Sequence, residues 1–226
     1  VLKSGAQRKA AELGLALITP DTSPRGDDVP TDPDGHWDFG HGAGYYLDAL
    51  REPWTTHYRM NSFLVDELFS LLSAELPIDV LRLGLSGHSM GGHGALVLGL
   101  RQPECFLSIS AVSPIAHPSA CPWGRKAFSF LLGDTPAAQA HWRQWDTVAL
   151  LEDGHRRSES LLVDVGLADP YLEEQLRPED LRIAAAENGQ PLDLVLHDGY
   201  DHSYFFVASM MDRHLEHHAR AMKLIV

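Results

Sequence analysis

The sequence predicts an α/β fold in which a mostly parallel sheet carries helices on both faces. Short apolar runs alternate with helix-like segments from one end of the chain to the other, which is typical of repeated strand–helix units. The apolar runs are continuous and end at Pro, Gly, Asp or Ser, as expected for strands that are buried on both faces. The 226 residues are enough for one domain with a sizeable core, so we expect a single domain over 1–226.

The elements are expected in a regular order along the chain. The predicted strands are residues 15–18, 80–85, 106–112, 161–165 and 192–196, and the predicted helices are 1–13, 62–76, 91–100 and 203–222. In the helix at 62–76 the apolar residues recur at a spacing that places them on one stripe. Two segments, 21–59 and 113–146, are expected to be long irregular loops, and such loops more often line a functional pocket than lie idle.

Composition excludes several classes of partner. Lys and Arg number 18 against 31 Asp and Glu, which gives a net charge of −13 and disfavours nucleic acid or an anionic membrane surface. No apolar run reaches the roughly 20 residues that a membrane span needs, and the first residues lack the apolar core of a signal peptide. Cys105 and Cys121 are too few for a disulfide framework, so a reducing, cytoplasmic setting is expected.

The strongest chemical signal is Gly-His-Ser-Met-Gly-Gly at 87–92, between a predicted strand and a predicted helix. This is the Gly-x-Ser-x-Gly nucleophile elbow of the α/β-hydrolase fold, in which a sharp turn exposes the serine above the sheet. Ser89 is therefore the predicted nucleophile. The helix that begins behind it favours a developing oxyanion, to which the backbone N–H of Met90 can donate.

A serine needs a base, and that base needs a carboxylate to orient it. In this fold the order is Ser, acid, His, each after a later strand. Asp169 follows the strand at 161–165 and is the predicted acid, whereas Asp164 lies inside that strand. His202 follows the last strand and is the predicted base, with His197 at the strand end as its rival.

No metal site and no cofactor are predicted. His214, His217 and His218 follow one another at helical spacing but not as His-Glu-x-x-His, and a solvated helix face is the expected explanation. Asp27, Asp28, Asp32 and Asp34 lack the spacing of a calcium loop and its closing Glu, and turn formation accounts for them.

Ordered matches over almost the whole chain resemble the S-formylglutathione hydrolase (esterase D) family. They are Asp-Thr-Ser-Pro-Arg-Gly at 21–26, Trp-Asp-Phe-Gly at 37–40, Gly-Ala-Gly-Tyr-Tyr at 42–46, Tyr-Arg-Met at 58–60, the elbow at 87–96, Cys-Pro-Trp-Gly at 121–124 and Gly-Tyr-Asp-His-Ser-Tyr at 199–204. The resemblance carries the family's nucleophile, acid and base onto Ser89, Asp169 and His202. It implies hydrolysis of S-formylglutathione to formate and glutathione, without a cofactor and often in a dimer.

The resemblance also has a departure. Sheets of this fold begin with several strands before the first helix, but this chain opens on a helix-like stretch at 1–13. Either N-terminal strands are missing or the sheet is abbreviated, and we favour the first. The family's second oxyanion donor lies in an N-terminal loop that this sequence does not contain.

Pocket residues are predicted on the two long loops. Trp37, Phe39 and Trp123 are expected to close a small acyl pocket, and Arg125 and Lys126 to attract an anionic substrate to a protein of net charge −13. Two alternatives stay open: a broad short-chain carboxylesterase or acyltransferase with the same chemistry, and a non-catalytic binding protein on the same fold.

Overall fold

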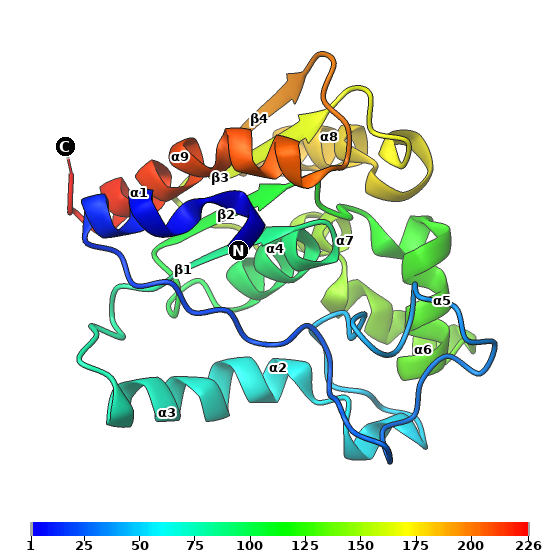
Figure 1. The fold of residues 1–226 in the computed structure, drawn as a ribbon. Helices are drawn as coiled ribbons and strands as arrows, with labels where there is room; N and C mark the ends of the chain where they lie inside the picture. The colour runs from blue at the N-terminus through cyan, green and yellow to red at the C-terminus, as the bar shows by residue number, and fades with distance from the viewer. Residues whose placement is uncertain (1, 226) are drawn as a thin grey trace.

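Residues 2–225 are described by a computed structural model. Four strands form one parallel sheet in the order β1-β2-β3-β4 (Figure 1): β1 (Gly84–His88), β2 (Ser108–Val112), β3 (Leu161–Gly166) and β4 (Leu192–His197). The registers pair His88 with Val112 and Gly166 with His197, so the carboxyl ends of neighbouring strands lie at the same edge. In an open parallel sheet that edge is where ligands bind.

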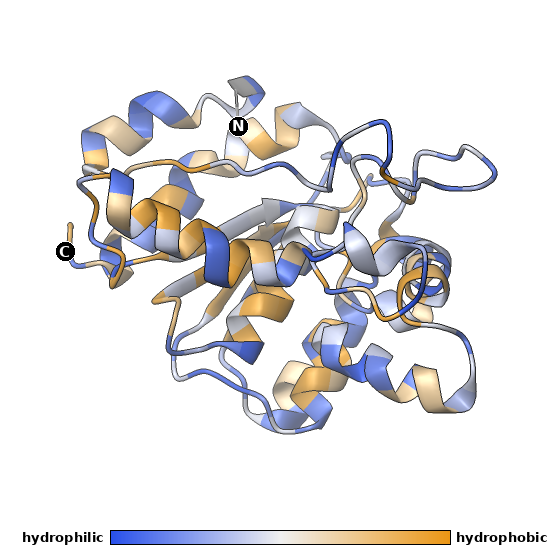
Figure 2. Cartoon of the chain, turned by 90° about the horizontal axis from the view of Figure 1, so that it is seen from below, coloured by the Kyte–Doolittle hydropathy of each residue, from blue (hydrophilic) through white to orange (hydrophobic). Residues whose placement is uncertain are grey.

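Helices cover both faces of this sheet, as the sequence predicts. The α-helices are α1 (Ala6–Leu13), α2 (Met60–Ser62), α3 (Leu68–Glu75), α4 (Met90–Arg101), α5 (Pro122–Leu131), α6 (Pro136–Trp142), α7 (Thr147–Glu152), α8 (Pro178–Asn188) and α9 (Tyr204–Ala221). Helix α9 lies on one face with α1 beside it, and α4, α7 and α8 pack on the other (Figure 1). Hydrophobic residues recur along the sides of these helices (Figure 2).

The segment 113–146 is not the irregular loop that the sequence suggested, because it contains α5 and α6. Each helix begins with a proline, which suits the first helical turn because its missing N–H has no partner there. The residue before each proline caps the helix: the Cys121 sulfur accepts from the N–H of Gly124, and the Thr135 hydroxyl accepts from that of Ala138. These start signals are present in the sequence, within the segment that was expected to be an irregular loop.

The predicted strand at 15–18 is also wrong, since these residues form no strand. They lie across an apolar groove of about 600 Å³ from β1, which ends the sheet on this side within the described residues. A strand requires a hydrogen-bonded neighbour, and here the groove separates the two segments. Leu64, Leu68 and Leu72 also line the groove.

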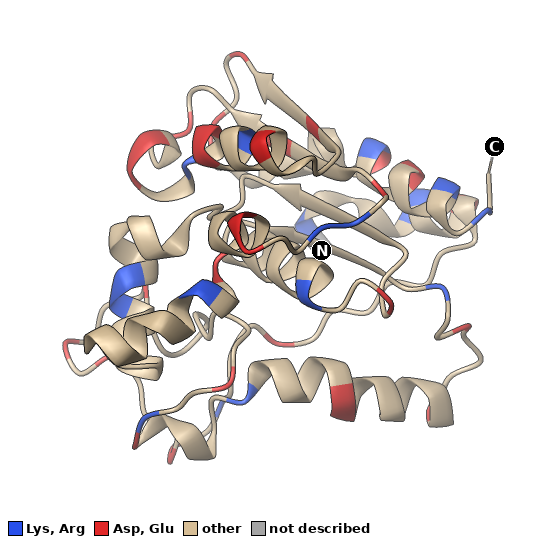
Figure 3. Cartoon of the chain, turned by 180° about the vertical axis from the view of Figure 1, so that it is seen from behind, with Lys and Arg blue, Asp and Glu red and all other residues tan. Residues whose placement is uncertain are grey.

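Strands β3 and β4 and helix α9 lie within one residue of their predicted bounds, whereas β1 begins at Gly84, four residues after the start of the strand expected at 80–85. Helix α8 was not expected. The helix expected at 62–76 is present but contains a π-helical turn, Phe63–Glu67, between α2 and α3. Acidic residues are spread over helices and loops in the view of Figure 3. None of the helices within residues 2–225 combines the length and the apolar character that crossing a bilayer requires.

Candidate active site

Ser89 stands at the sharp turn between β1 and α4. Its backbone has φ 57° and ψ −120°, a conformation that costs a non-glycine residue energy and is held by its surroundings. Its N–H donates to the Val112 carbonyl (3.0 Å), and its carbonyl accepts from the N–H of His93 (3.0 Å). Ser89 is half-buried, with the first turn of α4 directly behind it.

Two glycines around Ser89 are required by close backbone approach. A Cβ on Gly87 would lie 2.0 Å from the Gly91 carbonyl oxygen, and one on Gly92 would lie 2.9 Å from a side-chain carbon of Pro114. The turn can therefore close only with glycine at these places. Met90 is the first residue of α4, so its N–H has no acceptor within the helix and is free to face an oxyanion.

Asp169 and His202 are joined by a hydrogen bond of 2.5 Å between Oδ2 and Nδ1. Asp169 is buried, and its other oxygen, Oδ1, accepts from the Tyr171 backbone N–H at 2.9 Å. This arrangement places the imidazole proton on Nδ1 and turns Nε2 into the acceptor that a general base needs.

The loops that carry these two residues are bound to each other. The N–H of Ala168 donates to the Tyr200 carbonyl (2.9 Å), and that of Leu167 to the His197 carbonyl (2.9 Å). A Cβ on Gly166 would lie only 2.2 Å from the Tyr200 oxygen. The absence of a side chain at Gly166 thus lets the loop after β3 approach the loop after β4.

The rival residues form a separate pair. His197 Nε2 contacts Asp164 Oδ1 at 2.7 Å, and Asp164 also accepts from His214 Nε2 (2.9 Å) and from Arg213. Burial by itself would raise the pKa of Asp164, but these hydrogen bonds more than offset it and hold that pKa at about 2. Asp164 is thus an ionised carboxylate enclosed by donors from β4 and α9.

No hydrogen bond joins Ser89 to His202 within the described chain. The contact between them is through His88, the residue before Ser89, whose ring centroid lies 4.5 Å from that of His202. Burial first, and then the nearby His202, lower the pKa of His88 to about 4, so this ring is neutral near pH 7. Catalytic hydrogen bonds are often long before substrate binds, so this geometry is compatible with a base at His202.

Aromatic rings run outward from His202. The Tyr171 ring is edge-on to His202 at 5.2 Å, Trp123 lies 4.7 Å from Tyr171, and Trp37 lies 5.1 Å from Trp123. Trp37 is 70% exposed, so this row of rings connects the imidazole to the surface. Sequence reasoning missed Tyr171, although its position two residues after Asp169 placed it in the same loop.

Phe39 has a different environment from the two tryptophans. It is 1% exposed and packs among Trp54, Tyr58 and Phe130 in the core. Its contact with a substrate would require those rings to move, so it can affect a pocket only by supporting the wall. The two tryptophans remain the accessible aromatic candidates.

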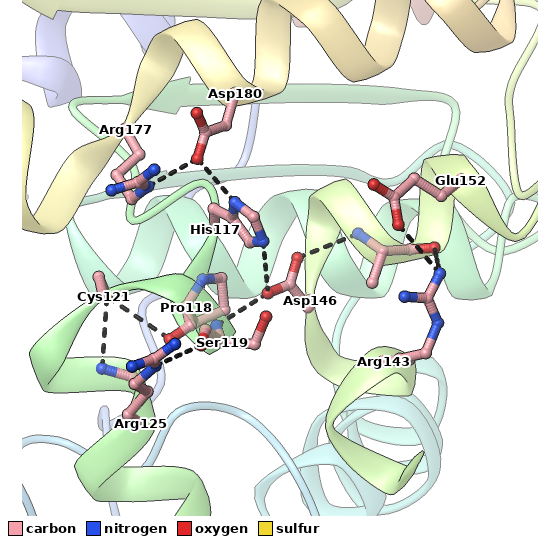
Figure 4. A network of polar contacts seen from close by, with 12 residues as sticks. His117, Pro118, Ser119, Cys121, Arg125, Arg143, Asp146, Glu152, Arg177 and Asp180 are labelled. Carbon is pink, nitrogen blue, oxygen red and sulfur yellow. Dashed lines mark hydrogen bonds and ion pairs between the residues drawn. The ribbon is translucent and has the colours of Figure 1, made fainter. Parts of the chain in front are cut away.

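The two basic candidates also differ from each other. Lys126 Nζ is held by Asp32 (2.5 Å), Asp38 (2.6 Å) and the His36 ring (3.3 Å). Arg125 is exposed, and its Nε donates to the Ser119 carbonyl at 2.8 Å (Figure 4). Buried Asp146 fixes this turn by accepting from the Ser119 N–H at 2.8 Å. Arg125 forms no ion pair within residues 2–225, and it is therefore the more available cation.

Asp32, Asp34 and His36 bring three potential metal ligands within 4.8 Å of one another. Two of them, Asp32 and His36, already contact the Lys126 ammonium, which supplies the positive charge at this place. We therefore interpret the cluster as the attachment of the 32–38 loop to α5.

The prediction of a solvated face for the histidines of α9 is wrong. His214 and His218 are buried against the sheet, and His218 is bound on both ring nitrogens, by Ser108 (2.7 Å) and Ser110 (2.9 Å). Burial lowers the pKa of His218 to about 3. The serines on β2 that make this possible could not be connected to α9 from sequence spacing.

Known proteins resemble this chain in sequence and in fold. The Esterase family model matches residues 1–217. The chain is 42% identical to S-formylglutathione hydrolase of Rattus norvegicus, over 97% of this chain and 77% of the rat protein. The structure of an S-formylglutathione hydrolase from Agrobacterium tumefaciens matches with a TM-score of 0.93 and 45% identity, over 97% of this chain and 78% of that one.

A more distant structure supports the fold alone. The fluorophosphonate-binding serine hydrolase FphF of Staphylococcus aureus matches with a TM-score of 0.70 at 17% identity, over 96% of this chain and 76% of that one. The strained serine elbow, the parallel sheet and the closer relatives agree with one another. The chain is a hydrolase of the α/β-hydrolase fold, and it belongs to the S-formylglutathione hydrolase (esterase D) family.

Proposed function

We propose that this chain hydrolyses S-formylglutathione to formate and glutathione through a formyl-serine intermediate, with Ser89, Asp169 and His202 as catalytic residues. The observation that carries the proposal is the pairing of two features at one edge of the sheet. One is the strained backbone of Ser89 (φ 57°), and the other is the 2.5 Å hydrogen bond from Asp169 to His202 Nδ1. The names of the rat and Agrobacterium relatives support the substrate.

In the first half of the reaction, His202 Nε2 takes the proton of Ser89 as its oxygen attacks the thioester carbonyl. The Met90 N–H, at the start of α4, stabilises the oxyanion of the tetrahedral intermediate. The sulfur–carbon bond then breaks, glutathione leaves as a thiol with the proton from His202, and the formyl group stays on Ser89.

In the second half, His202 removes a proton from water, and the hydroxide oxygen attacks the formyl-serine. Collapse of the second tetrahedral intermediate returns the proton to Ser89 and releases formate. Asp169 stabilises the imidazolium in both halves, because its buried carboxylate stays bonded to Nδ1.

We further propose that the acyl side of the site is small. Trp37 and Trp123 are rings held edge to face at 5.1 Å, whereas Phe39 lies in the core among Trp54, Tyr58 and Phe130. One methylene changes binding in an apolar pocket by only about 1–3 kcal/mol, so a formyl-selective enzyme needs steric closure. Arg125 and Lys126 lie on α5 just beyond Trp123, and we place the glutathione carboxylates toward the exposed Arg125.

The test compares wild type with Ser89→Ala on S-formylglutathione and on p-nitrophenyl esters of rising acyl length. Turnover by Ser89→Ala should fall by at least about 10⁴-fold, with an unchanged far-ultraviolet spectrum. A fluorophosphonate should label wild type and leave the variant unlabelled.

The same assay separates the rival activities. Equal rates on acetyl and octanoyl esters would favour a broad carboxylesterase, and ester formation from added alcohol would favour an acyltransferase. Absence of labelling and of turnover in the folded wild-type protein would favour a non-catalytic binding protein.

The cellular setting is part of the proposal. We place the chain in the cytoplasm, because Cys105 and Cys121 are both free thiols and the proposed product is itself a thiol. We also propose a homodimer, from the family resemblance, and sedimentation equilibrium measures it directly.

A further inference from the structure

Tyr171 contacts both residues of the proposed acid–base pair. Its backbone N–H donates to Asp169 Oδ1 at 2.9 Å, while Asp169 Oδ2 bonds His202. Its ring lies 5.2 Å from the His202 imidazole, with an angle of 88° between the two planes. One residue therefore touches the carboxylate through its backbone and the imidazole through its side chain.

Tyr171 is itself held firmly. Its carbonyl accepts from the N–H groups of Gln175 (2.9 Å) and Leu176 (3.0 Å) in the π-helical turn Leu172–Leu176. The Trp123 ring lies 4.7 Å from the Tyr171 ring, at an angle of 55°. Trp123 is fixed in turn, because its backbone N–H donates to the side-chain oxygen of buried Gln175 (3.1 Å).

The hydrogen bond to Asp169 does not by itself fix the plane of the His202 ring. Small rotations about the side-chain bonds can tilt the imidazole about the line from Oδ2 to Nδ1 without breaking that bond, and such a tilt moves Nε2 relative to Ser89. The described rings that contact the imidazole are His88 at 4.5 Å and Tyr171 at 5.2 Å. Edge-to-face contacts have a preferred geometry, so a fixed Tyr171 ring favours one tilt of the imidazole.

We propose that Tyr171 is a positioning residue for His202, with its ring setting the tilt of the imidazole and its backbone N–H the orientation of Asp169. This inference rests on the proposed function, since it requires His202 to be the base. Tyr171 itself transfers no proton. Its ring is needed for the rate of every substrate, because it acts through the base and not through the leaving group.

The test uses Tyr171→Ala and Tyr171→Phe, neither of which alters the backbone N–H to Asp169. Tyr171→Ala should lower kcat by roughly 10- to 100-fold on both S-formylglutathione and p-nitrophenyl acetate, with KM nearly unchanged for each, since small misplacements of catalytic groups are costly. The rate of fluorophosphonate labelling of Ser89 should fall in parallel. Tyr171→Phe keeps the ring and should restore most of the turnover.

Leu172→Ala is the matched control, because it truncates the next residue in the same turn. An equal loss in Leu172→Ala would overturn the inference by showing that damage to the turn is the cause. If Tyr171→Ala does not fold, Tyr171→Leu replaces it, filling the space without a flat ring, with the same expected loss of kcat.

Two other results would also overturn the inference. A rise in KM for S-formylglutathione alone would make Tyr171 a leaving-group contact, and unchanged kinetics and labelling would leave it no role. Failure of the proposed function is distinguishable, since it would appear as turnover retained by Ser89→Ala.

Discussion

Two aspartate–histidine pairs lie near the carboxyl ends of β3 and β4, and their surroundings differ. The Asp169–His202 pair has an imidazole whose Nε2 is free to act on a substrate within the described residues. The Asp164–His197 pair is joined by Arg213 and His214, so its carboxylate has a full set of donors from β4 and α9. The partners of each carboxylate are the reason why we propose His202, and not His197, as the base.

At the residue scale, exchanging each aspartate for asparagine should separate activity from stability. Asp169→Asn removes the acceptor that holds Nδ1–H and should lower kcat by about 10⁴-fold with a melting temperature close to wild type. Asp164→Asn leaves Arg213 and two histidines without their carboxylate, and should lower the free energy of unfolding by about 3 kcal/mol. Urea unfolding and steady-state kinetics on both variants check this, and the opposite pattern would exchange the two roles.

At the element scale, the contact of α9 with β2 should make the fold acid-labile. The pKa of His218 is about 3 in the fold, below its ordinary 6.5, so the unfolded chain binds more protons between these values. The stability from neutral His218 is complete above pH 6.5 and is lost as the pH falls toward 3, by about 2 kcal/mol at pH 5. His218→Gln should flatten this dependence in urea unfolding from pH 7 to pH 5. His155→Gln, an exposed control, should leave the slope unchanged.

The helix α5 carries two cations with different expected effects. Lys126→Met leaves buried Asp32 without its ammonium and should lower the free energy of unfolding by about 1–2 kcal/mol.

Arg125→Gln should instead raise KM for S-formylglutathione roughly 2- to 5-fold, with no change for uncharged p-nitrophenyl acetate, as expected for an exposed charge contact. Melting curves test the stability loss in Lys126→Met, and steady-state kinetics test the rise in KM in Arg125→Gln. An Arg125 variant that weakens both substrates equally would indicate structural damage.

At the scale of the whole molecule, an apolar groove of about 600 Å³ lies beside β1. It is lined on one side by Leu85 of β1 and on the other by Leu68 of α3. Contiguous exposed apolar surface of this kind binds apolar dyes. The folded chain should therefore enhance the fluorescence of anilinonaphthalene sulfonate at pH 7. Leu68→Lys should reduce that signal, whereas Leu71→Lys, on the exposed side of the same helix, should not. If wild type does not enhance the fluorescence of the dye, the groove is closed in solution.

The sequence by itself determined the strand–helix alternation, the elbow at Ser89 and the positions of Asp169 and His202 in the chain. These features depend on local signals, since a buried strand, a glycine turn and a helix start are each encoded within a few residues. Strands β2, β3 and β4 follow for the same reason, whereas the strand expected at 80–85 overlaps β1 only at its start. The choice of Asp169 and His202 over their rivals used only the order of elements, and it remains a prediction until the aspartate variants are measured.

Only the tertiary structure decided which residues meet. The row of rings from His202 through Tyr171 and Trp123 to Trp37 joins four segments that are distant in sequence, and no periodicity connects them. His218 appeared solvated because its serine partners lie on β2, more than one hundred residues earlier. The strand expected at 15–18 depended on a neighbour, and an apolar run pairs only where a second strand is within hydrogen-bonding distance. Local propensity sets the elements, but long-range contacts set the environment of each side chain, and that environment controls pKa, burial and chemistry.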